Sequence, residues 1–205
     1  MKSEFTYQAE SIVSPLETYE WDNTWLERIT EKGKKRVLYI GDSISCGIRR
    51  FATDAARGEI LFDGFGTSKA IDNPFYFDSI RLFAAQEGER SAVLFNNGLH
   101  GWHLSAKEYA QHYEKMILFL KSEFKDTPLY LLLSTPVRNN PERKEEIIKR
   151  NKEVIRLSKK YGLKTVDVFS FAEEIKELGK DDGVHFTDEG YKALAKSLLN
   201  KIEVN

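Results

Sequence analysis

Residues 37–43 read Val-Leu-Tyr-Ile-Gly-Asp-Ser, and this stretch decides the fold. An apolar run that ends at a glycine is typical of a strand buried on both faces, as in a parallel sheet. The residues after it place apolar side chains on one side of a helix: Ile44, Cys46, Ile48 and Phe51. The stretch therefore predicts a strand, a tight turn and a helix, with Ser43 at the carboxyl edge of a sheet. Open α/β folds bind their ligands at that edge.

The rest of the chain repeats this alternation of strand and helix. Five short apolar runs alternate with helical patterns: 37–40, 59–63, 92–95, 129–133 and 165–168. Such an alternation predicts a five-stranded parallel sheet wrapped by helices.

Local signals mark several helix ends. Asn73-Pro74 and Asn140-Pro141 each combine an N-cap residue with proline at the first helical position, and Ser105 to Glu108 is a capping box. Gly162 predicts the end of the helix that follows Asn140, and the last helix is expected to start at Thr187. Charges of both signs over 142–150 predict a solvated helix face.

Composition limits the classes of protein and of partner. A chain of 205 residues suits one domain, and 31 basic against 32 acidic residues leave a net charge of −1, so nothing favours a nucleic acid partner. Cys46 is the single cysteine and is expected to be a small buried hydrophobic residue. Glu4, Glu10, Glu17 and Glu20 interrupt the N-terminal region, which has neither a basic nor an apolar signal segment. We therefore expect a cytoplasmic location without a membrane partner.

Residues 1–35 stand apart from the alternating pattern, which we assign to a domain spanning 36–205. Trp21, Trp25, Leu26 and Ile29 predict a short helix that ends at Gly33. We expect an extension packed on the domain, and part of an oligomer interface is the alternative. The oligomeric state itself is not predicted.

Ser43 has two interpretations, as the N-cap of its helix or as a nucleophile. The second is favoured because Asp182-Gly183-Val184-His185 occurs just before the last helix. A serine hydroxyl becomes a good nucleophile when a base, held by a carboxylate, removes its proton. We assign His185 as this base and Asp182 as the carboxylate, with Asp181 as an alternative, and we expect Asp42 to bond the backbone of its turn.

Gly41-Asp42-Ser43 and Asp182 to His185, placed at the first strand and before the last helix, resemble the GDSL or SGNH family of serine esterases and acyl hydrolases. The resemblance covers about residues 36–200. It implies a three-layer α/β/α, flavodoxin-like fold and hydrolysis of a small-molecule ester without metal or cofactor.

The resemblance also implies an oxyanion hole, in which this chain departs from the family. Where the family carries Gly-x-Asn-Asp, aligning on Gly98 places His100 at the asparagine position. His100 can donate one ring N–H when neutral, and Asn97 is the alternative donor. The Ser43 backbone N–H and a glycine of the expected loop at 64–68 complete the hole. Gly66 is our choice over Gly64, and the alternative is that the two glycines only form a turn.

Three residues near these motifs are candidates for substrate binding. Trp102 and His103 could line a pocket, or one of them could belong to the core. Arg138 follows the fourth run and could hold a substrate carboxylate or phosphate, or could tie loops together through carbonyl groups.

We expect hydrolysis of a carboxylic ester, with deacetylation of a carbohydrate as the preferred reaction. A thioesterase or lysophospholipase is the rival enzyme, and a non-catalytic α/β binding domain is the rival from another class.

Overall fold

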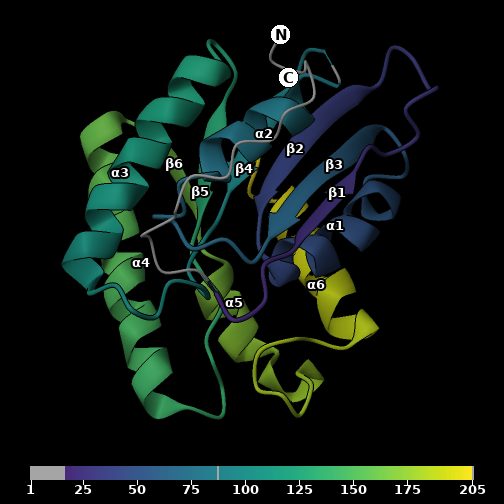
Figure 1. Ribbon diagram of the computed structural model, residues 1–205. Coiled ribbons are helices and arrows are strands. Elements are labelled where there is room, and N and C mark those ends of the chain that lie inside the picture. Colours follow the sequence, from purple (N-terminus) through teal and green to yellow (C-terminus); the bar gives the residue numbers. More distant parts are fainter. Residues whose placement is uncertain (1–16, 87, 205) are drawn as a thin grey trace, which may run out of the picture.

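A computed structural model describes residues 17–86 and 88–204 (Figure 1). Its centre is a six-stranded sheet in the order β1-β3-β2-β4-β5-β6. The strands are β1 (Asp22–Trp25), β2 (Lys35–Gly41), β3 (Ile60–Thr67), β4 (Ala92–Phe95), β5 (Leu129–Leu132) and β6 (Lys164–Val166). Strands β2 to β6 pair in parallel, whereas β1 pairs antiparallel with β3. The expected α/β class is confirmed, and the sheet is mixed, with one strand more than predicted.

Helices cover both faces of this sheet (Figure 1). They are α1 (Ser43–Ala55), α2 (Tyr76–Ala84), α3 (Ala106–Glu123), α4 (Pro141–Tyr161), α5 (Val168–Glu174) and α6 (Asp188–Leu199), with a short 3-10 helix at Lys176–Leu178. Strand β2 shows how the layers form, because Val37 and Tyr39 pack in the cluster beneath α1 and α6. Leu38 and Ile40 point to the opposite cluster, beneath α2 and α3. No helix within the described ranges is long and apolar enough to cross a membrane.

Most of the predicted helix ends are confirmed. Ser105 and Glu108 form the capping box of α3, Asn140 caps α4 ahead of Pro141, and Gly162 ends α4 in the left-handed conformation. Asn73 instead closes a turn before α2, since its side chain accepts from the Phe75 N–H at 2.9 Å.

Three predictions about elements are wrong. Residues 22–25 form an edge strand rather than a helix, because they pair with β3. The weak run 59–63 continues as strand to Thr67, and the last run ends at Val166, after which Asp167 caps α5. In the N-terminal region, the predictions for residues 1–16 lie outside the described residues.

Candidate active site

Ser43 lies at the first position of α1, directly after the turn that closes β2. Asp42, not Ser43, is the N-cap: its buried carboxylate accepts from the Ile44 N–H at 2.9 Å. The Ser45 hydroxyl donates to the Asp42 carbonyl at 2.7 Å and further fixes the turn. The interpretation of Ser43 as an N-cap is therefore wrong, and its half-buried hydroxyl is available for chemistry.

Asp182 holds His185 by three contacts within one turn. One carboxylate oxygen accepts from the backbone N–H groups of Val184 and His185, both at 2.8 Å. The other oxygen lies 2.8 Å from Nδ1 of the His185 ring. Gly183 makes this turn possible, since its φ of +74° lies in the left-handed region that favours glycine. Asp182, rather than Asp181, thus orients the ring.

The charge of Asp182 follows from the same contacts. Desolvation acts to raise the pKa of this carboxyl group, but the two backbone N–H groups and the His185 ring outweigh it and lower the pKa to about 2. Because a carboxylate accepts and does not donate, the neutral His185 ring carries its proton on Nδ1.

Nε2 of His185 lies 2.8 Å from the Ser43 hydroxyl oxygen, although the two residues are 142 positions apart in the chain. With the ring proton on Nδ1, Nε2 is the acceptor and the hydroxyl is the donor. The structure thus brings the three residues Ser43, His185 and Asp182 into one hydrogen-bonded relay.

Close contact between α1 and α6 sets the geometry of this relay. A Cβ added at Gly47 of α1 would lie 2.2 Å from the ring of Tyr191, so only glycine lets the two helices approach this closely. Ser43 precedes Gly47 by one turn, and His185 lies just before α6. The spacing between the two helices therefore fixes the spacing between hydroxyl and imidazole.

Arg138 ties down the loop that carries His185. Its guanidinium donates to the carbonyls of His185 at 2.6 Å and Lys180 at 3.1 Å, and it stacks over the Phe186 ring at 4.6 Å. The Arg138 backbone N–H donates to Gly183 at 2.7 Å. These contacts favour the loop-tying alternative over the binding of a substrate anion.

The loop after β4 carries the two candidate oxyanion donors. Asn97 is fully buried, and its side-chain amide donates to the Lys69 carbonyl at 2.8 Å. The His100 side chain is 19% exposed and lies edge-on to the Trp21 ring, with centroids 6.5 Å apart. The amide of Asn97 is thus committed to the core, whereas the His100 ring is accessible.

The carboxyl group of Asp42 is fully buried in the Ser43 turn. Burial raises the pKa of Asp42, and positive charge on His100 or His185 acts against this rise.

Gly66 lies within β3 and pairs with Gly41 of β2, so the expectation of a loop at 64–68 is wrong. A Cβ at Gly66 would come within 2.2 Å of the Cys46 sulfur, and one at Gly64 would come within 2.3 Å of the Arg49 side chain. These glycines let α1 pack against the sheet, which accounts for both without a turn. The role of Gly66 as an oxyanion donor stays a prediction.

Trp102 and His103 both make contacts outside the relay. Two guanidinium groups of α4 lie over the Trp102 ring, Arg143 at 4.8 Å and Arg150 at 5.0 Å from its centroid. Nε2 of His103 lies 2.9 Å from an Asp72 carboxylate oxygen. The structure thus gives each side chain a partner that holds a neighbouring loop, and their role in substrate binding stays a prediction.

Arg150 is a residue of this site that the sequence analysis missed. It is fully buried, so the expected solvated face at 142–150 is wrong at this position. Its guanidinium donates to four carbonyls of the loop after β4, those of Gly98, His100, Gly101 and Leu104. The signal was its spacing, because Arg150 falls on the same helix face as the buried Ile147 and Val154.

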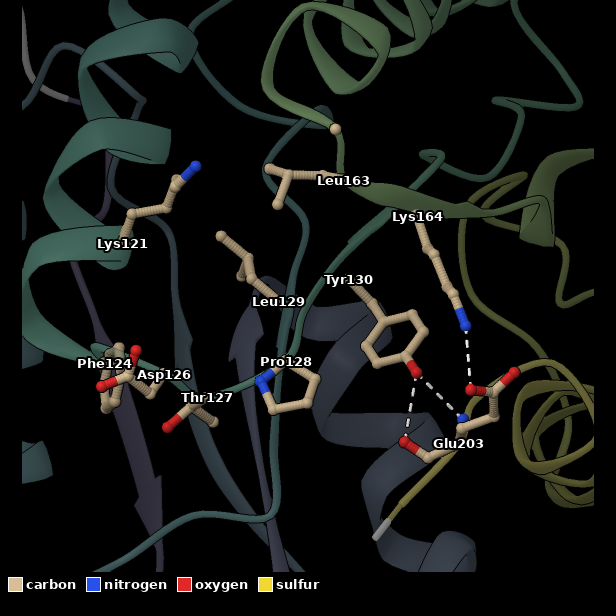
Figure 2. A pocket seen from close by; sticks show the side chains of 11 residues that line it. Lys121, Phe124, Asp126, Thr127, Pro128, Leu129, Tyr130, Leu163, Lys164 and Glu203 are labelled. Atoms are coloured by element: carbon tan, nitrogen blue, oxygen red, sulfur yellow. Dashed lines mark hydrogen bonds and ion pairs between the residues drawn. The ribbon is translucent and has the colours of Figure 1, made fainter.

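A cavity of about 430 Å³ lies at the other edge of the sheet, at the amino ends of β5 and β6 (Figure 2). Its polar groups bond one another: the Tyr130 hydroxyl donates to the Glu203 carbonyl at 3.1 Å, and Lys164 pairs with the Glu203 carboxylate at 2.9 Å. Ser43 follows the carboxyl end of β2, so this cavity is separate from the relay.

Comparison with known proteins gives one family and a set of structures. Residues 101–198 match the family model of the GDSL-like lipase/acylhydrolases. No curated protein matches the chain. Because the match begins after the serine turn, the role of Ser43 depends on the geometry above.

Solved structures of several enzymes share the fold. A member of the lipolytic G-D-S-L family from Veillonella parvula has a TM-score of 0.67 at 15% identity, over 81% of this chain and 97% of that one. An acetyl xylan esterase has a TM-score of 0.63 at 16% identity, over 82% and 100%. The C-terminal catalytic domain of peptidoglycan O-acetyltransferase A from Streptococcus pneumoniae has a TM-score of 0.64 at 16% identity, over 82% and 92%.

Proposed function

Because residues 101–198 match the family model of the GDSL-like lipase/acylhydrolases, we propose that this chain hydrolyses a carboxylic ester through an acyl intermediate on Ser43. The observation that carries the proposal is the relay from Asp182 through His185 to the Ser43 hydroxyl, with both ring contacts at 2.8 Å. A hydroxyl, an imidazole and a carboxylate in this order are the parts of a serine hydrolase.

In the first half of the reaction, the Ser43 oxygen attacks the ester carbonyl while Nε2 of His185 takes the hydroxyl proton. Asp182 is ionised and stabilises the imidazolium that forms. His185 then gives this proton to the departing alcohol, which leaves the acyl group on Ser43. In the second half, His185 takes a proton from water as the water oxygen attacks the acyl carbonyl. The bond between the acyl group and Ser43 then breaks, His185 returns the proton to the Ser43 oxygen, and the carboxylic acid leaves.

The negative oxygen of each tetrahedral intermediate needs donors that are already in place. The backbone N–H of Ser43 is one candidate, because it lies at the N-terminus of α1, where N–H groups are not used within the helix. The His100 ring is a second candidate, since the Asn97 amide is bound to the Lys69 carbonyl, and the Gly66 backbone N–H is a third.

For the substrate, we favour an O-acetyl ester of a carbohydrate. The Asn139 side chain donates to the Asp182 carbonyl at 3.1 Å beside the relay, and a polar group of this kind suits a sugar better than a long acyl chain. Two proteins of the same fold carry names that refer to acetyl groups on carbohydrate, the acetyl xylan esterase and the peptidoglycan O-acetyltransferase.

The test compares wild type with Ser43→Ala on short and long p-nitrophenyl esters and on acetylated xylan. Wild type is expected to prefer acetyl esters, and Ser43→Ala to lose several orders of magnitude in kcat. A fluorophosphonate should label Ser43 in wild type and equally in the control Cys46→Ala. Labelling at Ser45 or Cys46, or full activity of Ser43→Ala, would overturn the assignment, and a preference for long acyl chains would overturn the substrate class.

A further inference from the structure

The segment before β1 is fastened beside the serine turn. The Trp21 backbone N–H donates to the Ser68 hydroxyl at 2.8 Å, and the Ser68 N–H donates back to the Trp21 carbonyl at 3.1 Å. Glu20 adds side-chain contacts to Asn73 at 3.3 Å and to Ser68 at 3.4 Å. These bonds join the segment to the loop that follows β3.

Glu17 of this segment reaches the loop after β4. One of its carboxylate oxygens accepts from the Gly101 N–H at 2.7 Å, and the same oxygen lies 3.8 Å from Nδ1 of His100. The Glu17 side chain is 24% exposed, so water screens it only in part. Trp21, four residues later, packs against the His100 ring.

The loop around His100 is thus held from two sides. Arg150 binds its carbonyls, including that of His100 at 2.7 Å, and Glu17 binds the N–H of Gly101. Gly101 has a φ of +68°, a conformation that other residues rarely adopt. The backbone on both sides of His100 is therefore fixed, and the Glu17 carboxylate lies 3.8 Å from Nδ1 of its ring.

We propose that Glu17 is a positioning residue: its carboxylate holds Nδ1 of His100, so that Nε2 of the same ring faces the oxyanion formed at Ser43. This inference rests on the proposed function, because it assigns Glu17 a part in the same acyl transfer. It makes the segment before β1 a working part of the active site.

The protons of the ring determine what Glu17 contributes. A neutral ring with its proton on Nδ1 presents Nε2 as an acceptor, which repels an oxyanion. The protonated ring donates from both nitrogens, and the Glu17 carboxylate supplies the counter-charge for this form. A ring that donates from both nitrogens is a charged donor, and charged donors form stronger hydrogen bonds than the neutral asparagine amide of the family.

The experiment uses the full chain and three variants, Glu17→Gln, Glu17→Ala and the matched control Glu20→Gln. Glutamine keeps an acceptor for the Gly101 N–H but loses the charge at His100. We expect Glu17→Gln to lower kcat on p-nitrophenyl acetate about 10-fold and Glu17→Ala about 100-fold, with KM little changed, because a displaced catalytic group costs rate rather than binding. Glu20→Gln removes a charge from the same segment and should keep kcat within about 2-fold.

A double-mutant cycle separates positioning from a merely structural role. If Glu17 acts through His100, Glu17→Gln should change kcat less than about 2-fold in the His100→Ala background. An equal loss in both backgrounds would overturn the proposal, as would a kcat of Glu17→Gln that matches that of Glu20→Gln. These outcomes are distinguishable from failure of the proposed function, which would appear as hydrolysis by Ser43→Ala.

Discussion

Replacing Asp182 by asparagine should abolish the base while leaving the fold intact. Asparagine has the same shape, and its oxygen is needed where two backbone N–H groups point at Asp182 from 2.8 Å. The NH₂ group of the asparagine must then face Nδ1 of His185, at the place where a carboxylate oxygen of Asp182 lies 2.8 Å away in wild type. Two donors cannot face each other, so the ring proton moves to Nε2, the nitrogen that has to accept from Ser43.

The expected loss of activity comes from the wrong tautomer of the His185 ring. A carboxylate-to-amide change at this place in a serine relay lowers kcat about 10⁴-fold, which corresponds to about 5 kcal/mol of transition-state stabilisation. We expect a loss of this size in kcat for p-nitrophenyl acetate, with KM little changed. Urea unfolding should show a midpoint close to that of wild type, because both backbone contacts of the side chain persist.

Asp181→Asn is the matched control, since it makes the same change one residue earlier in an exposed side chain. Its kcat should stay within about 2-fold of wild type. The reasoning would be refuted if Asp182→Asn retained more than about a tenth of wild-type kcat, or if the loss appeared in Asp181→Asn instead.

Three further outcomes follow from the structure. His100→Ala should lower kcat about 10²-fold, and His100→Asn should recover part of that loss. Asn97→Ala should instead lower the free energy of unfolding by about 1–3 kcal/mol and leave kcat unchanged. The reverse pattern would move the oxyanion role to Asn97. Gly66→Ala should lower the free energy of unfolding, measured in urea, by about 1–3 kcal/mol. Adding Cys46→Ala to this variant should restore most of that loss, because the new Cβ meets the Cys46 sulfur. If stability were not restored, another contact would limit the space at Gly66. The pKa of Asp182 is lowered from 3.8 to about 2, so its contribution to stability is complete above about pH 4 and is lost as the pH falls through about 2. The urea midpoints of wild type and Asp182→Asn should therefore converge over that range. Because the Asp182 side chain is 47% exposed, the effect on the free energy of unfolding should stay below about 1 kcal/mol.

Features encoded by neighbouring residues could be predicted from the sequence. The capping box at Ser105, the Asn140-Pro141 start and the Gly162 end all depend on contacts within a few positions. The turn from Asp182 to His185 is of the same kind, because its three contacts span at most three residues.

Features that depend on distant partners could not be predicted in this way. Strand β1 has four exposed residues and little strand character of its own, and it forms because β3 offers an open edge. Arg138 and Trp102 were candidates for substrate binding because they adjoin the motifs. For Arg138 the alternative of tying loops together is the one the structure favours, because its guanidinium binds the His185 carbonyl. The Trp102 ring lies beneath Arg150, a partner 48 residues away in the sequence.

Glu17 and Arg150 show the same limit within the site. Their partners are 84 and 50 residues away, at Gly101 and His100, and no local pattern connects them. A charged residue on an otherwise apolar helix face was the available signal for Arg150. For Glu17 the sequence contains no comparable signal.

The contact between α1 and α6 bears on how the chain acquires activity. Gly47 and Tyr191 meet across helices that lie near opposite ends of the chain, so this contact forms only after a long loop has closed. A chain in which β2, β3 and α1 are already folded still has a nucleophile without its base. In a refolding experiment, ester hydrolysis should therefore return with the docking of α6 and not with the earlier gain of helical signal. The recovered rate of ester hydrolysis would then be proportional to the fraction of chains in which α6 has docked.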